Sequence, residues 1–405
     1  MKVAYIVSLF PKISETFILR EMEALRGRGA EITVVSLKHR REAMLHPEAE
    51  AFLGSTLYPS SPLGILRCLL GRLARNPGAL LTLAARVLAA HAAHPILLAK
   101  SLPVLATAVW VAERLEEKGV ERVHAHWATY PALAAWGIRR LAGIPYSITA
   151  HAHDIFLPNP LLAEKILGSE FTVTISGFNR DVIASLCGPV AAAKVRVIHC
   201  GIPLRLYPQR PSPPEGAARI ISVGRMVDYK GFITLLGAVA RLRGAGRDLR
   251  CDIVGDGPMR AEVEAEVGRL GLGGAVRLLG SRTQGEVRDL LRGATACVLA
   301  SERGRDGQMD GIPVVLMEAM AMGVPSVATR ISGIPEIIED GRTGFLAAPG
   351  DPASLAAAVA RLLDDPGMVR RVTSSARAKI EEEFDIERSA SALLRLMGQA
   401  AGAGA

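Results

Sequence analysis

The chain has 405 residues, of which 49% are hydrophobic and 22% are charged, so it can bury a sizeable core and is too polar for a bundle of membrane spans. Its 40 glycines and 24 prolines are close to ordinary usage, which argues against a collagen-like or disordered chain. Five widely spaced cysteines, without a C-x-x-C pair, predict neither a disulfide framework nor structural zinc. We expect a soluble α/β protein of two domains.

The first half of the chain carries most of the positive charge. Residues 1–200 hold 22 basic and 15 acidic side chains, which is +7 of the total +8. Residues 51–112 contain no acidic side chain but hold Arg67, Arg72, Arg75, Arg86 and Lys100. One interpretation of this basic, apolar stretch is that it contacts an anionic membrane surface or an acidic ligand. The equally weighted alternative is that its cations form the solvated face of ordinary packing helices. Nucleic acid is not expected as a partner, because no basic stripe is interleaved with aromatic residues.

The apolar segments are too short for targeting or membrane-spanning elements. Residues 1–11 end in a proline, and the cation-free segments 87–99 and 101–112 each contain one. We therefore expect a cytoplasmic protein, with peripheral attachment to the inner face of the cytoplasmic membrane left open.

Strand-like apolar runs alternate with helical patterns in both halves, which is typical of parallel sheets with crossover helices. The first half has predicted strands at residues 3–8, 31–37, 122–125, 146–149 and 171–175, and the second at 219–223, 250–254, 275–278, 296–299 and 326–328. Residues 207–218 hold four prolines and predict the linker. The expected division is 1–205, 206–384 and a final helical segment 385–405.

The loop after the first predicted strand excludes two common functions. Residues 10–17 lack a G-x-G-x-x-G fingerprint, and the chain has no Walker loop. The sequence therefore does not favour a dinucleotide oxidoreductase or a P-loop ATPase.

Two segments of the second half carry residues suited to binding a sugar phosphate. Arg225 and Lys230 stand five residues apart in a glycine-flanked loop, where they can neutralise a diphosphate. Asp310 and Glu318 bracket an apolar segment whose residues 314–322 predict a helix start. Such acids serve either as helix caps or as acceptors for sugar hydroxyls.

Together these residues resemble the retaining GT-B glycosyltransferases of family four, along nearly the whole chain. The motifs are Gly224-Arg225 with Lys230-Gly231, residues 254–258, the E-x7-E-like element from Asp310 to Glu318, and residues 332–336. Ser14-Glu15-Thr16-Phe17 and residues 149–154 look like the subgroup that builds exopolysaccharides such as colanic acid. The resemblance implies an α/β GT-B fold, in which two doubly wound Rossmann-like domains face a central cleft. In related GT-B enzymes the final helix crosses back to the first domain, and the segment 385–405 allows the same course.

The resemblance also implies roles for individual residues. Arg225 and Lys230 would bind the donor diphosphate, Glu318 would hold the ribose, and Asp310 would contact the donor sugar. The remaining donor-binding residues would be Gly224, Gly255, Asp256, Gly311, Ile312, Gly333 and Ile334. The acceptor side would be formed by Ser14, Glu15, Thr16 and Asp154.

The sequence departs from the family at two positions. Asp310 replaces the usual glutamate and is one methylene shorter, which leaves the identity of the donor sugar open. Pro203 stands where the family usually has an acid.

His151 occupies the position of the family's active-site histidine, where a neutral imidazole can hydrogen-bond the donor sugar. His124-x-His126 and His151-x-His153 also permit a four-histidine metal cluster, the lesser alternative, since alternate strand residues share a face. Because no D-x-D element occurs and no obvious carboxylate completes the cluster, we expect no metal and no cofactor.

The predicted activity is retaining, metal-independent transfer of a sugar from a nucleotide-sugar donor to a saccharide acceptor, which would be lipid-linked. A nucleotide-sugar epimerase of the same fold is a rival, and it would convert the donor without an acceptor. A non-catalytic nucleotide-sugar-binding subunit is the other rival, although it would more naturally have lost Arg225, Lys230 or Glu318. The sequence does not specify the base, sugar, acceptor or oligomeric state.

Overall fold

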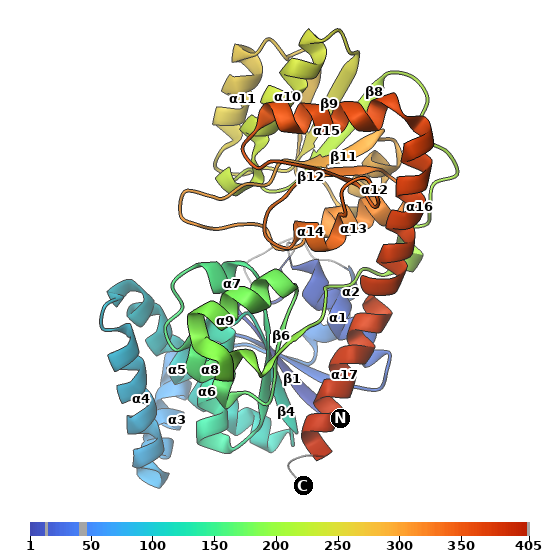
Figure 1. The fold of residues 1–405 in the computed structure, drawn as a ribbon. Coiled ribbons are helices and arrows are strands. Elements are labelled where there is room, and N and C mark those ends of the chain that lie inside the picture. The colour runs from blue at the N-terminus through green and yellow to red at the C-terminus, as the bar shows by residue number, and fades with distance from the viewer. Residues whose placement is uncertain (13–14, 40–46, 403–405) are drawn as a thin grey trace. The chain divides into compact units, whose positions relative to one another are not determined.

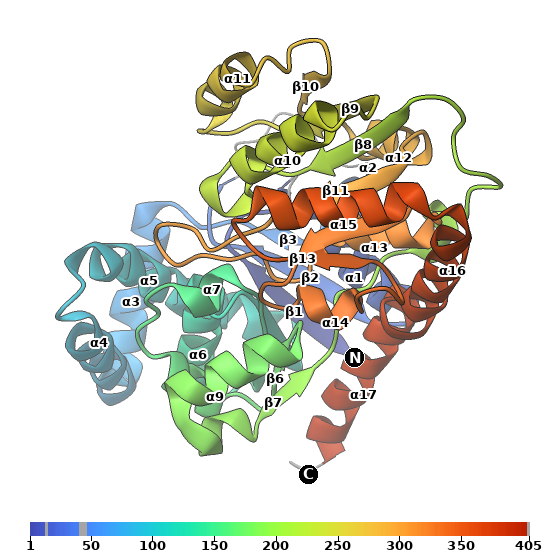
Figure 2. The ribbon, with the colours of Figure 1, turned by 45° about the horizontal axis from the view of Figure 1, so that its top comes forward.

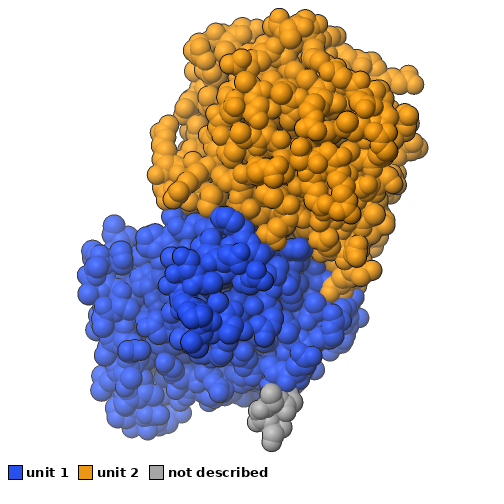
Figure 3. All heavy atoms as spheres, in the orientation of Figure 1, with its two compact units in different colours: residues 1–199, 389–405 blue, residues 200–388 orange. Residues whose placement is uncertain are grey.

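The computed structural model describes residues 1–12, 15–39 and 47–402 and divides into two compact units. The first unit comprises Met1–His199 with Ser389–Ala405, and the second comprises Cys200–Arg388 (Figure 3). Each unit has its own parallel sheet and its own hydrophobic core.

The first unit contains a seven-stranded sheet in the order β3-β2-β1-β4-β5-β6-β7, with every pair parallel (Figure 1). The strands are β1 (Lys2–Val7), β2 (Glu31–Ser36), β3 (Thr56–Leu57), β4 (Arg122–His126), β5 (Tyr146–Ala150), β6 (Thr172–Thr174) and β7 (Val195–Val197). The central strands β4 and β5 are buried on both faces, as expected for a parallel sheet covered by helices.

Helices cover both faces of this sheet (Figure 2). They are α1 (Thr16–Arg26), α2 (Pro47–Leu53), α3 (Pro62–Arg75), α4 (Pro77–His91), α5 (Pro95–Glu117), α6 (Tyr130–Ala142), α7 (His153–Phe156), α8 (Leu162–Gly168), α9 (Gly177–Ala192) and α17 (Ile386–Gly402). Side-chain caps from Ser61 and Asn76, each followed by a proline, start α3 and α4.

Helix α5 is the one helix of the described residues that is long and apolar enough to cross a membrane. Its carboxyl-terminal half packs against α6 and is buried at Leu105, Val109, Val111 and Leu115. This burial identifies α5 as a core helix of the first unit.

The second unit contains a six-stranded parallel sheet in the order β10-β9-β8-β11-β12-β13. The strands are β8 (Ala218–Val223), β9 (Leu249–Val254), β10 (Val276–Gly280), β11 (Ala296–Leu299), β12 (Ser326–Thr329) and β13 (Phe345–Ala347). The helices are α10 (Phe232–Gly244), α11 (Arg260–Arg269), α12 (Gln284–Arg292), α13 (Val314–Ala321), α14 (Ile334–Ile337), α15 (Pro352–Asp364) and α16 (Pro366–Glu383), with 3-10 turns at Leu204–Leu206 and Asp228–Lys230.

The chain divides at different residues from those predicted. The first boundary falls after His199, and residues 207–218 lie inside the second unit, where the Tyr207 side chain is fully buried. These residues are therefore part of the second unit rather than a linker between the two units. The final helix leaves the second unit after Arg388, and Ser391 of this helix accepts a hydrogen bond from Arg28 of the first unit.

Candidate functional site

The sheet of the second unit reverses its strand order between β8 and β11. Ligands of doubly wound sheets bind outside the carboxyl ends of the strands at such a reversal. The loop after β8 carries Arg225 and Lys230, and the loop after β11 carries Ser301 and Asp310. The fold therefore gathers the predicted phosphate-binding cations and the first predicted acid at the edge where a ligand is expected.

Lys230 and Asp310 form an ion pair across this edge. The Lys230 Nζ lies 2.8 Å from Asp310 Oδ1, and Ser301 Oγ donates to Asp310 Oδ2 at 2.6 Å. Both charged side chains are largely withdrawn from solvent, with 16% and 11% exposed. The aspartate is thus held by two donors and faces the same loop as the lysine.

Two glycines allow the loops at this edge to approach each other. Gly255 has φ +132°, and a Cβ at this position would lie 1.9 Å from the carbonyl oxygen of Gly224. The Lys230 side chain lies over Gly224, whose added Cβ would come within 3.2 Å of the lysine Cδ. Side chains at these glycines would therefore close the approach to the strand ends.

The exposed Arg225 makes no hydrogen bond or ion pair within the described part of the chain. Asp256 is also exposed; its Oδ1 accepts the backbone N–H of Gly257 at 2.7 Å, and Arg260 pairs with its Oδ2 at 3.4 Å. Arg225 is thus placed to meet an anion, whereas Asp256 mainly stabilises its own turn.

The second predicted acid, Glu318, is buried on helix α13 with 6% exposed. The hydroxyl of Tyr207 donates to its Oε1 at 2.6 Å. Tyr207 comes from the segment that the sequence predicted as a linker, so its contact with Glu318 was missed. One carboxylate oxygen is therefore fixed by the protein.

The predicted backbone donors lie near the ends of β11 and β12. Gly333 and Ile334 are buried at the start of the short helix α14, and Gly311 and Ile312 precede α13. The neighbouring Ser332 has φ +50°, and its buried hydroxyl has no hydrogen-bond partner among the described residues. Strained backbone with an unpartnered buried donor is typical of ligand-binding segments.

In the first unit, His151 follows the last residue of β5 and is 5% exposed. Its imidazole contacts the rings of Phe17 and Trp127, whose centroids lie 4.8 and 4.6 Å away. Trp127 has φ +82°, and its buried indole N–H has no hydrogen-bond partner in the described ranges. A positive φ and a buried donor without a partner, the two features also found at Ser332, make this end of the first sheet a second candidate binding surface.

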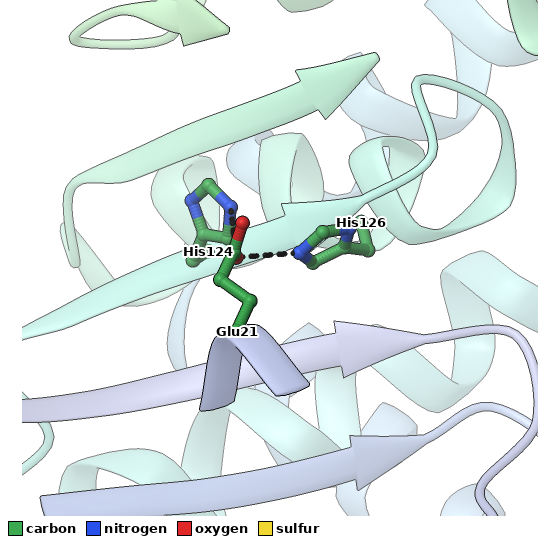
Figure 4. Close-up of side chains that lie close together, drawn as sticks. All are labelled: Glu21, His124 and His126. Atoms are coloured by element: carbon green, nitrogen blue, oxygen red, sulfur yellow. Dashed lines mark hydrogen bonds and ion pairs between the residues drawn. The ribbon is translucent and has the colours of Figure 1, made fainter. Parts of the chain in front are cut away.

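Figure 4 shows the side chains of Glu21, His124 and His126, which lie close together, and His126 of this group contacts His151. His126 Nε2 donates to Glu21 Oε1 at 2.8 Å, and His126 Nδ1 lies 3.3 Å from His151 Nε2. Burial lowers the pKa of His151 well below its ordinary value, and the neighbouring His126 lowers it further. His151 is therefore a neutral imidazole at physiological pH.

Glu21 is ionised despite its burial. Burial raises the pKa of its carboxyl, but the charge and hydrogen bond of His126, with contributions from His124 and Tyr5, outweigh burial and lower the pKa to about 2. Burial, with the nearby His126, lowers the pKa of His124 to about 3, so His124 is also neutral.

Glu21, His124 and His126 are the one trio of described residues whose ligand atoms lie close enough to hold a metal ion, within 4.8 Å of one another. Each of these atoms already has a hydrogen-bond partner, and both nitrogens of His124 are bonded to the hydroxyls of Ser147 and Thr149. The four-histidine cluster does not assemble, because β5 ends at Ala150 and His153 begins α7 with an exposed side chain. The donor set is occupied by hydrogen bonds and does not favour a metal.

The predicted acceptor-side residues separate into two groups. Asp154 is fully buried, and its carboxylate accepts the backbone N–H groups of His151 and Ala128, so it holds the His151 loop in place. Glu15 is 8% exposed, pairs with Lys12 at 2.6 Å and directly precedes Thr16, the first residue of α1. Ser14 lies outside the described residues.

Sequence reasoning missed Glu21, Tyr207, Ser301 and Ser332. The His-x-His spacing on β4 signalled that His126 shares a face with a neighbour, but no local pattern signalled Glu21, which lies 105 residues from His126. Ser332 is the first residue of the motif 332–336 but was not singled out, and Ser301 follows the predicted strand 296–299 by two residues.

Two family models cover most of the chain. The model described as Glycosyltransferase Family 4 matches residues 14–206, and the model described as Glycosyl transferases group 1 matches residues 206–379. A Salmonella typhimurium protein that is named as the colanic acid biosynthesis glycosyltransferase WcaL is 27% identical to this chain. The match covers 98% of this chain and 100% of WcaL. The amylovoran biosynthesis glycosyltransferase AmsK of Erwinia amylovora is 40% identical, over 41% of each chain.

The fold is shared with solved glycosyltransferase structures. Anabaena HepE, solved in complex with UDP and glucose, has a TM-score of 0.72 at 18% identity, covering 98% of this chain and 100% of HepE. At this identity the likeness shows the fold, which is GT-B. From its two family models and its fold, the chain belongs to the group 1, family 4 glycosyltransferases.

Proposed function

We propose that the protein transfers a sugar from a nucleotide-diphosphate donor to a saccharide acceptor in the synthesis of a bacterial exopolysaccharide. The observation that carries this proposal is the cluster of Arg225, Lys230 and Asp310 at the strand-order reversal of the second sheet. The names of WcaL and AmsK, which refer to colanic acid and amylovoran, support the polysaccharide class. HepE, whose solved complex contains UDP and glucose, supports the donor class.

The donor site would bind the diphosphate through positive charge and the sugar and ribose through hydrogen bonds to their hydroxyls. Arg225 and Lys230 would hold the diphosphate and stabilise the charge that develops as the bond to the sugar breaks. Asp310 would accept sugar hydroxyls, and Glu318 the ribose hydroxyls, because an ionised carboxylate accepts several O–H bonds at once. His151, neutral and buried, would hydrogen-bond a hydroxyl of the transferred sugar.

The proposed reaction retains the configuration at the sugar carbon. The acceptor hydroxyl attacks from the face that the diphosphate leaves, and a diphosphate oxygen takes the proton of that hydroxyl. The glycosidic bond to phosphate breaks as the new glycosidic bond forms, so the step needs neither an enzymic nucleophile nor a metal. Proton NMR of the product tests retention directly, since donor and product must share the same anomeric configuration.

A thermal-shift screen against UDP, GDP, ADP and TDP sugars, with EDTA present, tests the donor site. A ligand at a hundred times its Kd stabilises the folded state by about 2.7 kcal/mol. We expect one nucleotide class to shift the wild type and not the Arg225→Ala/Lys230→Ala variant. The matched control is Arg269→Ala/Arg342→Ala, which removes two exposed arginines elsewhere in the second unit. Conversion of the donor without an acceptor would identify an epimerase instead, and a shift that requires a divalent metal would contradict metal independence.

We also propose that α3 and α4 attach the protein to an anionic membrane, where a lipid-linked acceptor would lie. Helix α3 has no buried residue and exposes Leu63, Leu66, Leu70 and Leu73, which recur every three or four residues along one face. Arg72, Arg75 and Arg86 pair with acids of α5 and α8. Arg67 and Lys100 make no ion pair among the residues that the structure describes. Leucines beside cations suit the boundary between headgroups and acyl chains.

Flotation with vesicles of anionic lipid tests this attachment. We expect the wild type to float and the Leu66→Ser/Leu70→Ser variant to remain at the bottom. The control Leu186→Ser/Val190→Ser changes two exposed apolar residues on α9 and should float as the wild type does. No flotation of the wild type at low salt would overturn the membrane proposal.

A further inference from the structure

The second unit has a pocket at the edge of its sheet opposite the candidate donor site. The donor residues follow the carboxyl ends of β8 and β11, whereas Thr295 and Pro325 of the pocket directly precede β11 and β12. These strands are parallel, so their amino ends lie together at the other edge. The outer walls are the segment before β8 and the turn between α15 and α16, which lie beside each other in Figures 1 and 2.

The pocket has a volume of about 420 Å³, within the range of sites that hold small molecules. Its walls are mostly apolar, and Leu363 and Val369 also pack against the core of the second unit. No aromatic ring on which a nucleobase could stack belongs to the described lining. The apolar walls are formed by Pro211, Pro213, Pro325, Leu362, Leu363 and Val369.

Arg210, which lines this pocket, is a buried cation and is 9% exposed. Its Nη1 donates to the carbonyl oxygens of Ala294 at 2.5 Å and Arg292 at 3.5 Å. Its Nε and Nη2 make no hydrogen bond within the part of the chain that the structure describes. Burial lowers the pKa of Arg210 to about 10, so the side chain is still charged at neutral pH. Because a buried charge is costly unless it is paired, the free edge of this guanidinium suits the two oxygens of an anion.

Acidic side chains do not neutralise the pocket. Its lining also includes the exposed Arg370, and neither arginine forms an ion pair with an acid in the described ranges. Of the two acids at the turn between α15 and α16, Asp364 accepts from both Nη atoms of Arg247, at 2.7 and 2.8 Å. The other, Asp365, accepts the first backbone N–H groups of α16. The described lining thus carries two positive charges and no negative one.

Hydrogen bonds hold the wall before β8 in place. The backbone N–H of Arg210 donates to the carbonyl of Met322 at 3.0 Å. Arg377 of α16 donates to the carbonyls of Tyr207 at 2.9 Å and Ala321 at 2.6 Å. The pocket is therefore formed before any ligand binds, as is usual for small-molecule sites.

We propose that this pocket is a second ligand site, which binds an anionic amphiphile: a carboxylate or phosphate group held by Arg210 and Arg370, with an aliphatic chain against the leucines and prolines. An inorganic anion alone would leave the apolar walls in water, and an uncharged chain would leave the buried arginine unpaired. Both parts of the ligand are therefore needed. The inference does not depend on the proposed transferase function, because the two sites lie at opposite edges of the sheet.

Calorimetry of the full chain with octanoate and with octyl phosphate, below their micelle concentrations, tests the site. We expect at least one of them to bind at one site per chain, and the tighter of the two distinguishes a fatty acid from a lipid phosphate as the source. Octanol, which lacks the charge, and inorganic phosphate, which lacks the chain, should each bind at least about 10-fold more weakly. Binding of neither amphiphile, or equal binding of octanol or of inorganic phosphate, would overturn the proposal.

Charge variants identify the cations that hold the head group. Arg210→Lys keeps a positive charge but loses the planar fork, and Arg370→Gln removes an exposed charge; each should raise the Kd about 10-fold. Arg371→Gln is the matched control, because it removes the next arginine on α16, which does not line the pocket, and it should keep the wild-type Kd. A wild-type Kd in Arg370→Gln, which can be tested even if Arg210→Lys does not fold, would contradict the assignment.

Two measurements locate the probe. In methyl NMR we expect the octyl compounds to shift the signals of Leu362, Leu363 and Val369, and not that of Val223 at the donor edge. The Arg225→Ala/Lys230→Ala variant should bind them as the wild type does. Loss of binding in this variant would place the probe in the donor site and overturn the second site. Absence of nucleotide binding by the wild type would contradict the transferase proposal and leave this site standing.

Discussion

The Lys230 ammonium lies 2.8 Å from the Asp310 carboxylate, so the cation proposed to bind the donor diphosphate is neutralised by the acid proposed to bind the donor sugar. A diphosphate that reaches Lys230 must compete with this aspartate or share the ammonium with it. Three hydrogens on the ammonium allow sharing, because Lys230 can donate to both groups at once. The pair thus couples phosphate binding to the placement of the carboxylate.

Replacing Asp310 should separate binding from turnover. Asp310→Asn removes a negative charge beside the diphosphate and keeps an oxygen that can accept from Ser301. We expect the nucleoside diphosphate to bind as tightly as in the wild type or more tightly, whereas kcat falls by about 10- to 100-fold because a charge-assisted hydrogen bond to the sugar is lost. Calorimetry and steady-state kinetics measure the two effects. Lys230→Ala should show weaker diphosphate binding, and a parallel loss of binding in both variants would contradict the division of roles.

The Tyr207 hydroxyl donates a hydrogen bond of 2.6 Å to Oε1 of the buried Glu318. Tyr207→Phe leaves a buried carboxylate oxygen without this donor, which should cost about 1–3 kcal/mol of unfolding free energy. We also expect weaker binding of a nucleoside diphosphate, because the released carboxylate no longer has a fixed orientation toward the ribose. The corresponding 2′,3′-dideoxynucleotide is the control ligand: it lacks the hydroxyls, so Tyr207→Phe should not change its Kd.

The predicted strands account for ten of the thirteen strands in the described residues and leave out β3, β7 and β13. β3, β7 and β13 have two or three residues each, too few for an apolar run to stand out from its surroundings. Phe345 and Ala347 nevertheless belong to the core, because β12 supplies the pairing that their short segment cannot signal alone. These short segments become strands because they pair with neighbouring strands, and a single sequence does not show that pairing.

The donor side of the candidate site was predictable because its residues stand in local motifs. Arg225, Lys230, Asp310 and Glu318 each belong to a segment whose glycines and spacing carry information. The contact between Tyr207 and Glu318 spans 111 residues, and that between Glu21 and His126 spans 105. No local pattern marks such partners, since folding alone brings them together.

Two loops approach each other closely at Gly255, so we expect any side chain at this position to destabilise the protein. Gly255→Ala would place a Cβ 1.9 Å from the Gly224 carbonyl oxygen, at a φ of +132°. We expect a loss of more than about 3 kcal/mol, since both backbone segments must move. Gly268→Ala on α11 is the matched control; its Cβ meets nothing within 4 Å, and a helical alanine should stabilise by about 0.5–1 kcal/mol. Far-UV circular dichroism in urea measures both. Equal midpoints for the two variants would contradict the close packing.

The buried Glu21–histidine group should make the first unit sensitive to acid. The folded-state pKa of His124 is lowered to about 3 by burial and by His126, whereas the unfolded chain takes up the proton near the ordinary value of 6.5. The unfolded state therefore binds more protons between these values, and stability falls as the pH falls. Glu21, with a pKa lowered from 4.5 to about 2, stabilises the fold above pH 4.5 and loses this contribution as the pH drops toward 2. Both effects have the same sign.

The three tryptophans of the chain, Trp110, Trp127 and Trp136, all lie in the first unit, so their fluorescence reports its unfolding separately. We expect the unfolding free energy from urea titrations to fall between pH 6.5 and 5 by about 2 kcal/mol for each histidine that stays neutral in the folded state, of which His124 is one. His124→Gln removes that titrating group and keeps side-chain atoms that can bond Ser147 and Thr149, so its stability should fall less steeply over the same range. An identical pH slope in the wild type and in this variant would show that His124 is protonated in the folded protein, and that the carboxylate of Glu21 is shared between both histidines of β4.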